Sequence, residues 1–264
     1  MQSGSEMRHV KSIIKKGYSI FSKVVPGFYY PYQFSGGRIY IDITESPMML
    51  ARVRGKYEVE KHKALCTFLK PGSTFIDVGV NKGDFSLVAA KIVGANGKVI
   101  AFEPEPTNCK WIAKSIEING YKNIMLYDIA LSDQNGTAQL YIGEKSGWHT
   151  LVSGQNYRDR GVINVKTRTL DSFLQDINFN DPIDVIKIDV EGADLQVLKG
   201  ASNTFSKSKN IVLLMDIHPK LGVNQKEVCG FLEEKGFSIF HDKSPFSSPV
   251  TDYRNLTSIV AIKS

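Results

Sequence analysis

Four stretches of this 264-residue sequence place carboxylates where apolar, strand-like segments end. The first is FIDVGVNKGD at residues 75–84, in which Asp77 closes the segment and Asp84 follows a glycine turn. Glycines there let the backbone approach a ligand closely and adopt positive φ. A dinucleotide site would hold a pyrophosphate at this turn, usually with G-x-G-x-x-G spacing. The two acids favour instead a zwitterionic ligand that carries a sulfonium.

The turn supplies five predicted ligand-binding residues, which are Asp77, Gly79, Asn81, Gly83 and Asp84. The second stretch, IAFEPEP at 100–106, ends the next apolar segment with Glu103, followed by Pro104. Glu103 lies 24 residues beyond Gly79, close to the interval of about 20 residues at which an acid binds ribose hydroxyls. Position and pattern predict that Glu103 and Pro104 bind a ribose-bearing ligand.

The third and fourth stretches extend this series. Asp128 and Ile129 follow a further apolar segment, where they are expected to meet an adenine amino group and ring. In IKIDVEG at 186–192, Asp189 and Glu191 end another segment. Carboxyl ends of parallel strands meet at one edge of a sheet, so these acids are expected to share a crevice with the first turn.

The four stretches, with ALSD at 130–133 and TLD at 169–171, resemble the FkbM-type methyltransferases over residues 55–217. The resemblance implies an S-adenosyl-L-methionine-dependent enzyme that methylates hydroxyl groups. The acceptor is then expected to be a sugar, a glycan or a secondary metabolite.

Transfer of a methyl group to a hydroxyl requires alignment of the reactants and benefits from a base that removes the hydroxyl proton. Candidate catalytic residues are Asp189, Glu191 and His218, the last of which follows the apolar segment 210–217 and has an ordinary pKa suited to a base. His149 is a further candidate in the glycine-rich loop 143–154. That loop is expected to form a lid over the acceptor, with Trp148, Tyr157, Arg158 and Arg160.

Two other functions compete with this interpretation. An NAD(P)-dependent oxidoreductase would share the ribose acid but needs a third glycine that the turn lacks. A non-catalytic nucleotide-binding module would not need acids at four strand ends. No metal is predicted, although a divalent ion held by Asp189, Glu191, Asp216 and His218 is the alternative.

Apolar strand-like and helical segments alternate from residue 57 onward. This pattern predicts an α/β protein with a Rossmann-like, seven-stranded, mostly parallel doubly wound sheet. Strands are expected at 74–79, 98–103, 123–128, 184–189, 210–217, 237–240 and 256–262, with additional strands at 137–142 and 162–168. Helices are expected at 58–69, 85–93, 107–119, 193–198 and 226–235.

The predicted methyltransferase domain, 57–264, follows an N-terminal basic, aromatic extension, 1–56. Residues 1–63 hold 11 Lys and Arg against five Asp and Glu, whereas the remaining residues hold 22 of each. This uneven distribution argues against a nucleic-acid-binding surface. The apolar spacing of 10–24 predicts a helix packed on the main domain, with peripheral membrane contact through 8–34 as the alternative.

Three widely spaced cysteines, Cys66, Cys109 and Cys229, show neither a metal-binding nor a disulfide pattern. The N-terminus lacks the apolar core of a secretory signal, and no stretch approaches the roughly 20 apolar residues of a membrane span. A cytoplasmic location is therefore expected. The composition leaves the oligomeric state open.

Overall fold

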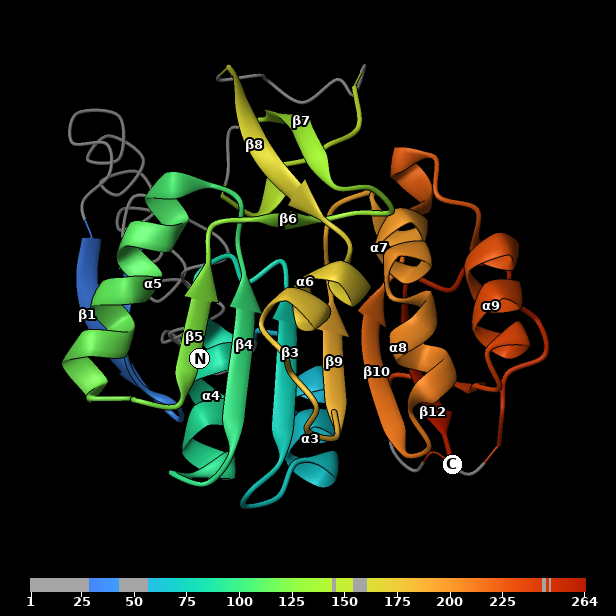
Figure 1. Cartoon of the computed structure of the whole chain (residues 1–264), viewed down its shortest axis with the longest axis horizontal. Helices are drawn as coiled ribbons and strands as arrows, with labels where there is room; N and C mark the ends of the chain where they lie inside the picture. Colours follow the sequence, from blue (N-terminus) through green and yellow to red (C-terminus); the bar gives the residue numbers. More distant parts are fainter. Residues whose placement is uncertain (1–28, 43–56, 144–145, 154–160, 244–245, 247) are drawn as a thin grey trace, which may run out of the picture.

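The computed structural model describes residues 29–42, 57–143, 146–153, 161–243, 246 and 248–264. Its centre is a seven-stranded sheet in the order β11-β12-β10-β9-β3-β4-β5, in which β12 alone runs antiparallel to its neighbours (Figure 1). The strands are β3 (Thr74–Val78), β4 (Lys98–Phe102), β5 (Ile124–Tyr127), β9 (Val185–Ile188), β10 (Ile211–Asp216), β11 (Ser238–His241) and β12 (Ser258–Lys263). The predicted fold class is confirmed.

Helices cover both faces of this sheet because its strands alternate apolar side chains between two cores. Phe75 of β3 packs with helices α3 and α4, whereas Ile76 and Val78 pack in the core on the other face. The first face is covered by α3 (Val59–Phe68), α4 (Asp84–Val93) and α5 (Pro106–Asn119). The second face is covered by α6 (Leu170–Asp176), α7 (Asp194–Gly200), α8 (Ser202–Lys207) and α9 (Gln225–Glu234). Helices α6 and α8 were not predicted.

A small sheet lies across the carboxyl ends of the central strands (Figure 1). Its order is β6-β8-β7, from β6 (Ala130–Leu131), β7 (Gly136–Tyr141) and β8 (Val162–Arg168). The additional strands expected at 137–142 and 162–168 are β7 and β8 of this cap. The segment between them contains the short 3-10 helix η1 (Ser146–Trp148).

The described part of the N-terminal region is an antiparallel hairpin of β1 (Tyr29–Phe34) and β2 (Gly37–Asp42). Ile39 and Ile41 are buried against Leu87 of α4. Asn119 of α5 accepts a hydrogen bond of 2.7 Å from the amide of Arg38. This hairpin was not predicted, and the helix expected at 10–24 lies outside the described residues. The domain division at residue 57 stays a prediction.

None of the helices in the described ranges is long and apolar enough to cross a lipid bilayer.

Candidate active site

The turn after β3 packs directly against the end of β9. Gly79 has φ +80°, and a Cβ at this position would lie 1.9 Å from the Asp189 carbonyl oxygen. Only glycine fits both the conformation and the contact. The Gly79 carbonyl accepts a hydrogen bond of 2.7 Å from Lys187 Nζ. The turn is therefore fixed to β9 by a buried lysine.

Lys187 also bridges two carboxylates. Its Nζ lies 3.6 Å from Asp77 Oδ1 and 3.6 Å from Asp189 Oδ2. Asp77 and Lys187 are register partners in adjacent parallel strands, and Ser86 Oγ of α4 donates a hydrogen bond of 2.6 Å to Asp77. Burial opposes the charge of Lys187, but the carboxylates of Asp189 and Asp77 hold its pKa above its usual value. Asp77 thus faces the α4 side of the sheet, within this charged cluster.

A cavity opens at the carboxyl ends of β3, β4 and β9, and we call it the donor cavity. Apolar walls come from Phe102, Ile129, Leu131 and Leu140. Six predicted ligand-binding residues line it, which are Gly79, Asn81, Glu103, Pro104, Ile129 and Asp189.

Glu103 is the buried acid of this cavity. Its Oε2 accepts a hydrogen bond of 2.7 Å from the Asn81 amide, and its Oε1 accepts one of 3.1 Å from the Glu105 amide. Burial raises the pKa of Glu103 to about 7, against the effect of these two donors. The carboxylate is thereby oriented by the backbone before any ligand binds.

Four other predicted ligand-binding residues lie outside the lining of the donor cavity, namely Asp77, Gly83, Asp84 and Asp128. Gly83 precedes α4 with φ +96°, and Asp84 is buried in the first turn of that helix. Asp128 is exposed directly after β5. Direct ligand contact by these four residues stays a prediction.

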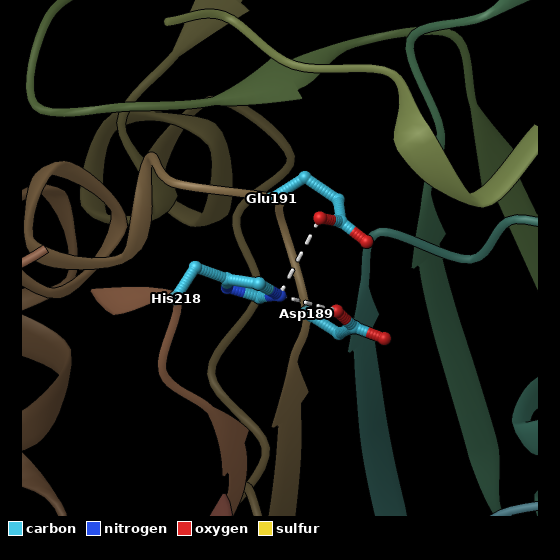
Figure 2. A group of neighbouring side chains, drawn as sticks. All are labelled: Asp189, Glu191 and His218. Atoms are coloured by element: carbon cyan, nitrogen blue, oxygen red, sulfur yellow. Dashed lines mark ion pairs between the residues drawn. The ribbon is translucent and has the colours of Figure 1, made fainter. Parts of the chain in front are cut away.

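The three predicted catalytic residues lie close together (Figure 2), and all three line the donor cavity. His218 Nε2 lies 3.5 Å from Asp189 Oδ1 and 3.7 Å from Glu191 Oε2. On the opposite side of the ring, His218 Nδ1 lies 3.0 Å from Asp194 Oδ1, and Asp194 is fully buried. Asp194 therefore fixes the imidazole so that Nε2 faces Asp189 and Glu191.

The electrostatics assign different protonation states to these groups. Burial opposes the charged form of His218, but hydrogen bonds to Asp189 and Asp194 raise its pKa to about 11, which makes it an imidazolium. Burial would raise the pKa of Asp189, yet Lys187 and His218 hold it below its usual value. Burial raises the pKa of Glu191 to about 7, with only partial opposition from His218. Glu191 is thus the acid of this group that titrates near neutrality.

A second charged group adjoins the first. Lys61 Nζ of α3 forms ion pairs with Glu58 Oε2 at 2.9 Å and with Asp216 of β10. Burial and the charge of Asp189 raise the pKa of Asp216 to about 6, and Lys61 opposes that rise. Lys61 thereby brings a buried positive charge to the ends of β9 and β10.

Two sets of carboxylate and imidazole groups are close enough to hold a metal ion, with ligand atoms within 4.8 Å of one another. They are Asp189, Glu191 and His218, and Glu58, Asp189 and Asp216. The His218 imidazolium and Lys61 already bring positive charge to these two sets. The absence of a metal requirement stays a prediction.

The cap contributes to the site through the segment after β7. Trp148 and His149 line the donor cavity. Thr150 is buried, and its Oγ1 donates a hydrogen bond of 2.5 Å to the Glu191 carbonyl. Glu191 has φ 49°, a conformation that is costly for a residue with a side chain. The other predicted lid residues, Tyr157, Arg158 and Arg160, lie outside the described residues.

Sequence reasoning assigned no role to Lys187, Asp194, Lys61 or Glu58. A lysine inside the apolar segment VIKI was a signal for a buried charge with a partner. Asp194 has only the pattern of an acid near the start of a helix, which is common. Lys61 and Glu58 lie before the first predicted strand, 74–79. Their partners are distant in sequence, since Lys61 and Asp216 are 155 residues apart.

This sheet order, with a glycine turn after the central strand and acids at the neighbouring strand ends, defines a class I methyltransferase fold. The chain belongs to the FkbM methyltransferase family, because residues 77–239 match the Methyltransferase FkbM domain. The function expected from the resemblance is confirmed to the level of methyl transfer.

Three curated relatives carry methyltransferase names. The chain is 27% identical to methyltransferase sdnD of Sordaria araneosa, over 67% of this chain and 78% of the relative. It is 28% identical to the 2-O-methyltransferase NoeI of Sinorhizobium fredii, over 57% of this chain and 66% of the relative. It is 29% identical to the hexuronic acid methyltransferase AglP of Haloferax volcanii, over 61% and 62% of the respective chains.

S-adenosylmethionine is the methyl donor of this enzyme class, and several lining residues of the donor cavity suit its chemical groups. Glu103 offers a buried, backbone-oriented carboxylate suited to ribose hydroxyls. Ile129 and Leu140 provide apolar surface suited to a purine ring. Asp189 is held ionised at the end of the cavity, where a cationic group is favoured.

Proposed function

We propose that this protein transfers a methyl group from S-adenosylmethionine to a hydroxyl oxygen of a sugar, a glycan or a secondary metabolite. The observation that carries the proposal is the group Asp189, Glu191 and His218, which joins a fixed imidazolium to an acid with a pKa of about 7. A hydroxyl acceptor needs a base of this kind, because its proton must leave as the new C–O bond forms.

The donor supplies a methyl carbon activated by an adjacent sulfonium. In this proposal Glu103 holds the ribose hydroxyls, while Pro104 and Ile129 contact the adenine ring. Gly79 and Asn81 also line the cavity, and the Asn81 amide lies beside the Glu103 carboxylate. Asp189 places its negative charge beside the sulfonium and so contributes to orientation, which is the main task of the protein in an in-line displacement.

Glu191 is the proposed general base. Its pKa of about 7 lets it be ionised near neutral pH and still accept a proton. His218 is already protonated and held by Asp194, so it serves as a positioning residue that orients Asp189 and Glu191. Of the three predicted catalytic residues, Glu191 is therefore assigned the proton transfer.

The relatives support oxygen as the acceptor atom. NoeI is named as a 2-O-methyltransferase, and AglP is named for a hexuronic acid. The family match favours a methyltransferase over an NAD(P)-dependent oxidoreductase and over a non-catalytic binding module.

Calorimetry with S-adenosylmethionine and with NAD tests the donor. We expect S-adenosylmethionine to bind and NAD not to bind, and NAD binding alone would contradict the proposal. Incubation with donor carrying a ¹³C-methyl group and a panel of methyl glycosides tests the acceptor atom, because NMR distinguishes O-methyl from N-methyl and C-methyl products. The same reaction in EDTA tests the prediction that no metal is needed.

We also propose a cytoplasmic protein whose N-terminal residues 10–24 form a helix packed on the main domain, with peripheral membrane contact through residues 8–34 as the alternative. Deletion of residues 1–28 leaves the buried hairpin in place, because Ile39 and Ile41 remain. The membrane alternative predicts that this deletion abolishes co-sedimentation of the full chain with anionic liposomes. Absence of binding by the full chain would contradict the membrane contact.

A further inference from the structure

A second cavity adjoins the donor cavity, with a volume of about 860 Å³. This volume is within the range of about 300–1,000 Å³ that is typical of small-molecule sites. The two cavities share four lining residues, which are Glu58, Glu191, Asp216 and His218. The proposed base therefore faces both cavities, and we call the second one the acceptor cavity.

The charged groups of the acceptor cavity are predominantly acidic. Its lining includes five carboxylates, from Glu58, Glu60, Glu191, Asp216 and Asp242. Lys61 is engaged by Glu58 and Asp216, and His218 by Asp194 and Asp189. Lys220 is the remaining cationic side chain among the described lining residues. The five acids of the lining outnumber its three cationic side chains, Lys61, His218 and Lys220, so the cavity as a whole disfavours an anionic acceptor.

The uncharged groups of this cavity suit a ring that has both hydroxyl groups and C–H faces. Ser258 of β12 is the register partner of Asp216, and its buried Oγ has no hydrogen-bond partner within the described residues. A ligand hydroxyl would satisfy this orphaned group. Val59, with 37% of its surface exposed, and Pro219 add apolar contact area to the lining.

Resting on the proposed function, we infer that the acceptor cavity binds a neutral, polyhydroxylated ring such as an uncharged sugar, and disfavours sugars that carry a carboxylate. This assignment separates the chain from AglP, which is named for a hexuronic acid. In the transfer, the acceptor oxygen gains the methyl carbon as the carbon–sulfur bond breaks, and the hydroxyl proton passes to Glu191.

The test compares methyl β-D-glucopyranoside with methyl β-D-glucuronide, a pair that differs by one carboxylate. Binding of each is measured by ligand-observed NMR to the full chain saturated with S-adenosylhomocysteine. We expect the neutral glucoside to bind about tenfold more tightly. Tighter binding of the glucuronide, equal binding of both sugars, or binding of neither would overturn the inference.

Two variants connect this preference to the cavity. Asp242 is not one of the four lining residues that the two cavities share. Asp242→Lys reverses its charge, so the preference for the glucoside is expected to shrink or reverse. Ser258→Ala is expected to weaken glucoside binding severalfold and to leave S-adenosylhomocysteine affinity unchanged. An unchanged preference in Asp242→Lys would overturn the inference, as would full glucoside affinity in Ser258→Ala. Failure of S-adenosylhomocysteine to bind would contradict the proposed function itself, which distinguishes the two outcomes.

Discussion

The hydroxyl of Thr150 donates a hydrogen bond of 2.5 Å to the carbonyl oxygen of Glu191. Thr150 belongs to the segment after β7, whereas Glu191 follows β9 of the central sheet, so the bond joins the cap to the proposed base. Glu191 has the left-handed φ of 49°, and Gly192 follows with φ 102°. Such conformations persist where surrounding structure holds them. Thr150 is therefore one of the residues that set the direction of the Glu191 side chain.

Thr150→Val removes this hydroxyl and keeps the shape of the side chain. We expect kcat to fall about tenfold, which corresponds to the roughly 1.4 kcal/mol of a lost buried hydrogen bond. Affinity for S-adenosylmethionine, measured by calorimetry, should stay within about twofold, because Thr150 does not line the donor cavity. Thr150→Ser keeps the hydroxyl and is the matched control. Equal activity of the two variants would contradict a role for this bond.

The raised pKa of Glu191 predicts how the rate of methyl transfer depends on pH. Its pKa is raised to about 7, so its ionised, basic form increases as the pH rises through 7. The rate should increase over the same interval, whereas proton transfer to His218, with a pKa of about 11, would place the rise at much higher pH.

Glu191→Gln should lower kcat by about 10²–10⁴-fold and abolish the pH-dependent rise. Glu234→Gln, at the exposed end of α9, is the control and should behave as the wild type. A pH profile of Glu191→Gln that still rises near 7 would assign the titration to another group.

Variants of Glu103 and Asp128 test two predicted contacts with the donor, one to the ribose and one to the adenine. Glu103 is buried in the donor cavity, whereas Asp128 is exposed outside its lining. Glu103→Gln should weaken S-adenosylhomocysteine binding by about ten- to a hundredfold, and Asp128→Asn by less. Calorimetry measures both affinities, and a thermal melt of each variant checks that folding is preserved. A larger loss in Asp128→Asn would place the adenine contact at Asp128.

Strand ends could be located from the sequence because apolar segments stop at glycine turns, and this placed Glu103, Asp189 and Glu191 correctly at one edge of the sheet. The face of the sheet on which the Asp77 side chain lies could have been predicted as well. Residues 75 and 77 share a face of β3, and Phe75 packs against α4.

The partners of the buried charges could not be predicted in the same way. Lys61 reaches Asp216 across 155 residues, and Asp194 reaches His218 across 24. Such contacts depend on strand order and helix packing, which local patterns do not encode. Two strands of the cap were predicted, but the third, β6, is only two residues long and pairs with β8 through tertiary structure, so the cap sheet itself could not be predicted.

The Lys187–Asp77 pair predicts a large effect on stability. Both side chains are buried, and Lys187 also holds the Gly79 carbonyl. Lys187→Met leaves Asp77 and Asp189 without their shared cation, so the free energy of unfolding should fall by about 3–5 kcal/mol. The double variant Lys187→Met with Asp77→Asn should lose less than the sum of the single variants, because no unpaired charge remains at Asp77.

The Lys98–Asp181 pair provides the matched control for this measurement. It is also a lysine–aspartate ion pair, but its side chains are 46% and 50% exposed. Lys98→Met should therefore change the free energy of unfolding by only about 0–1 kcal/mol. Urea denaturation of the wild type, of the single variants Lys187→Met, Asp77→Asn and Lys98→Met, and of the double variant gives the comparison. Equal losses in Lys187→Met and Lys98→Met would mean that Lys187 does not hold the turn after β3 to β9, because a buried cation with three oxygen partners must cost more to remove than a solvated one.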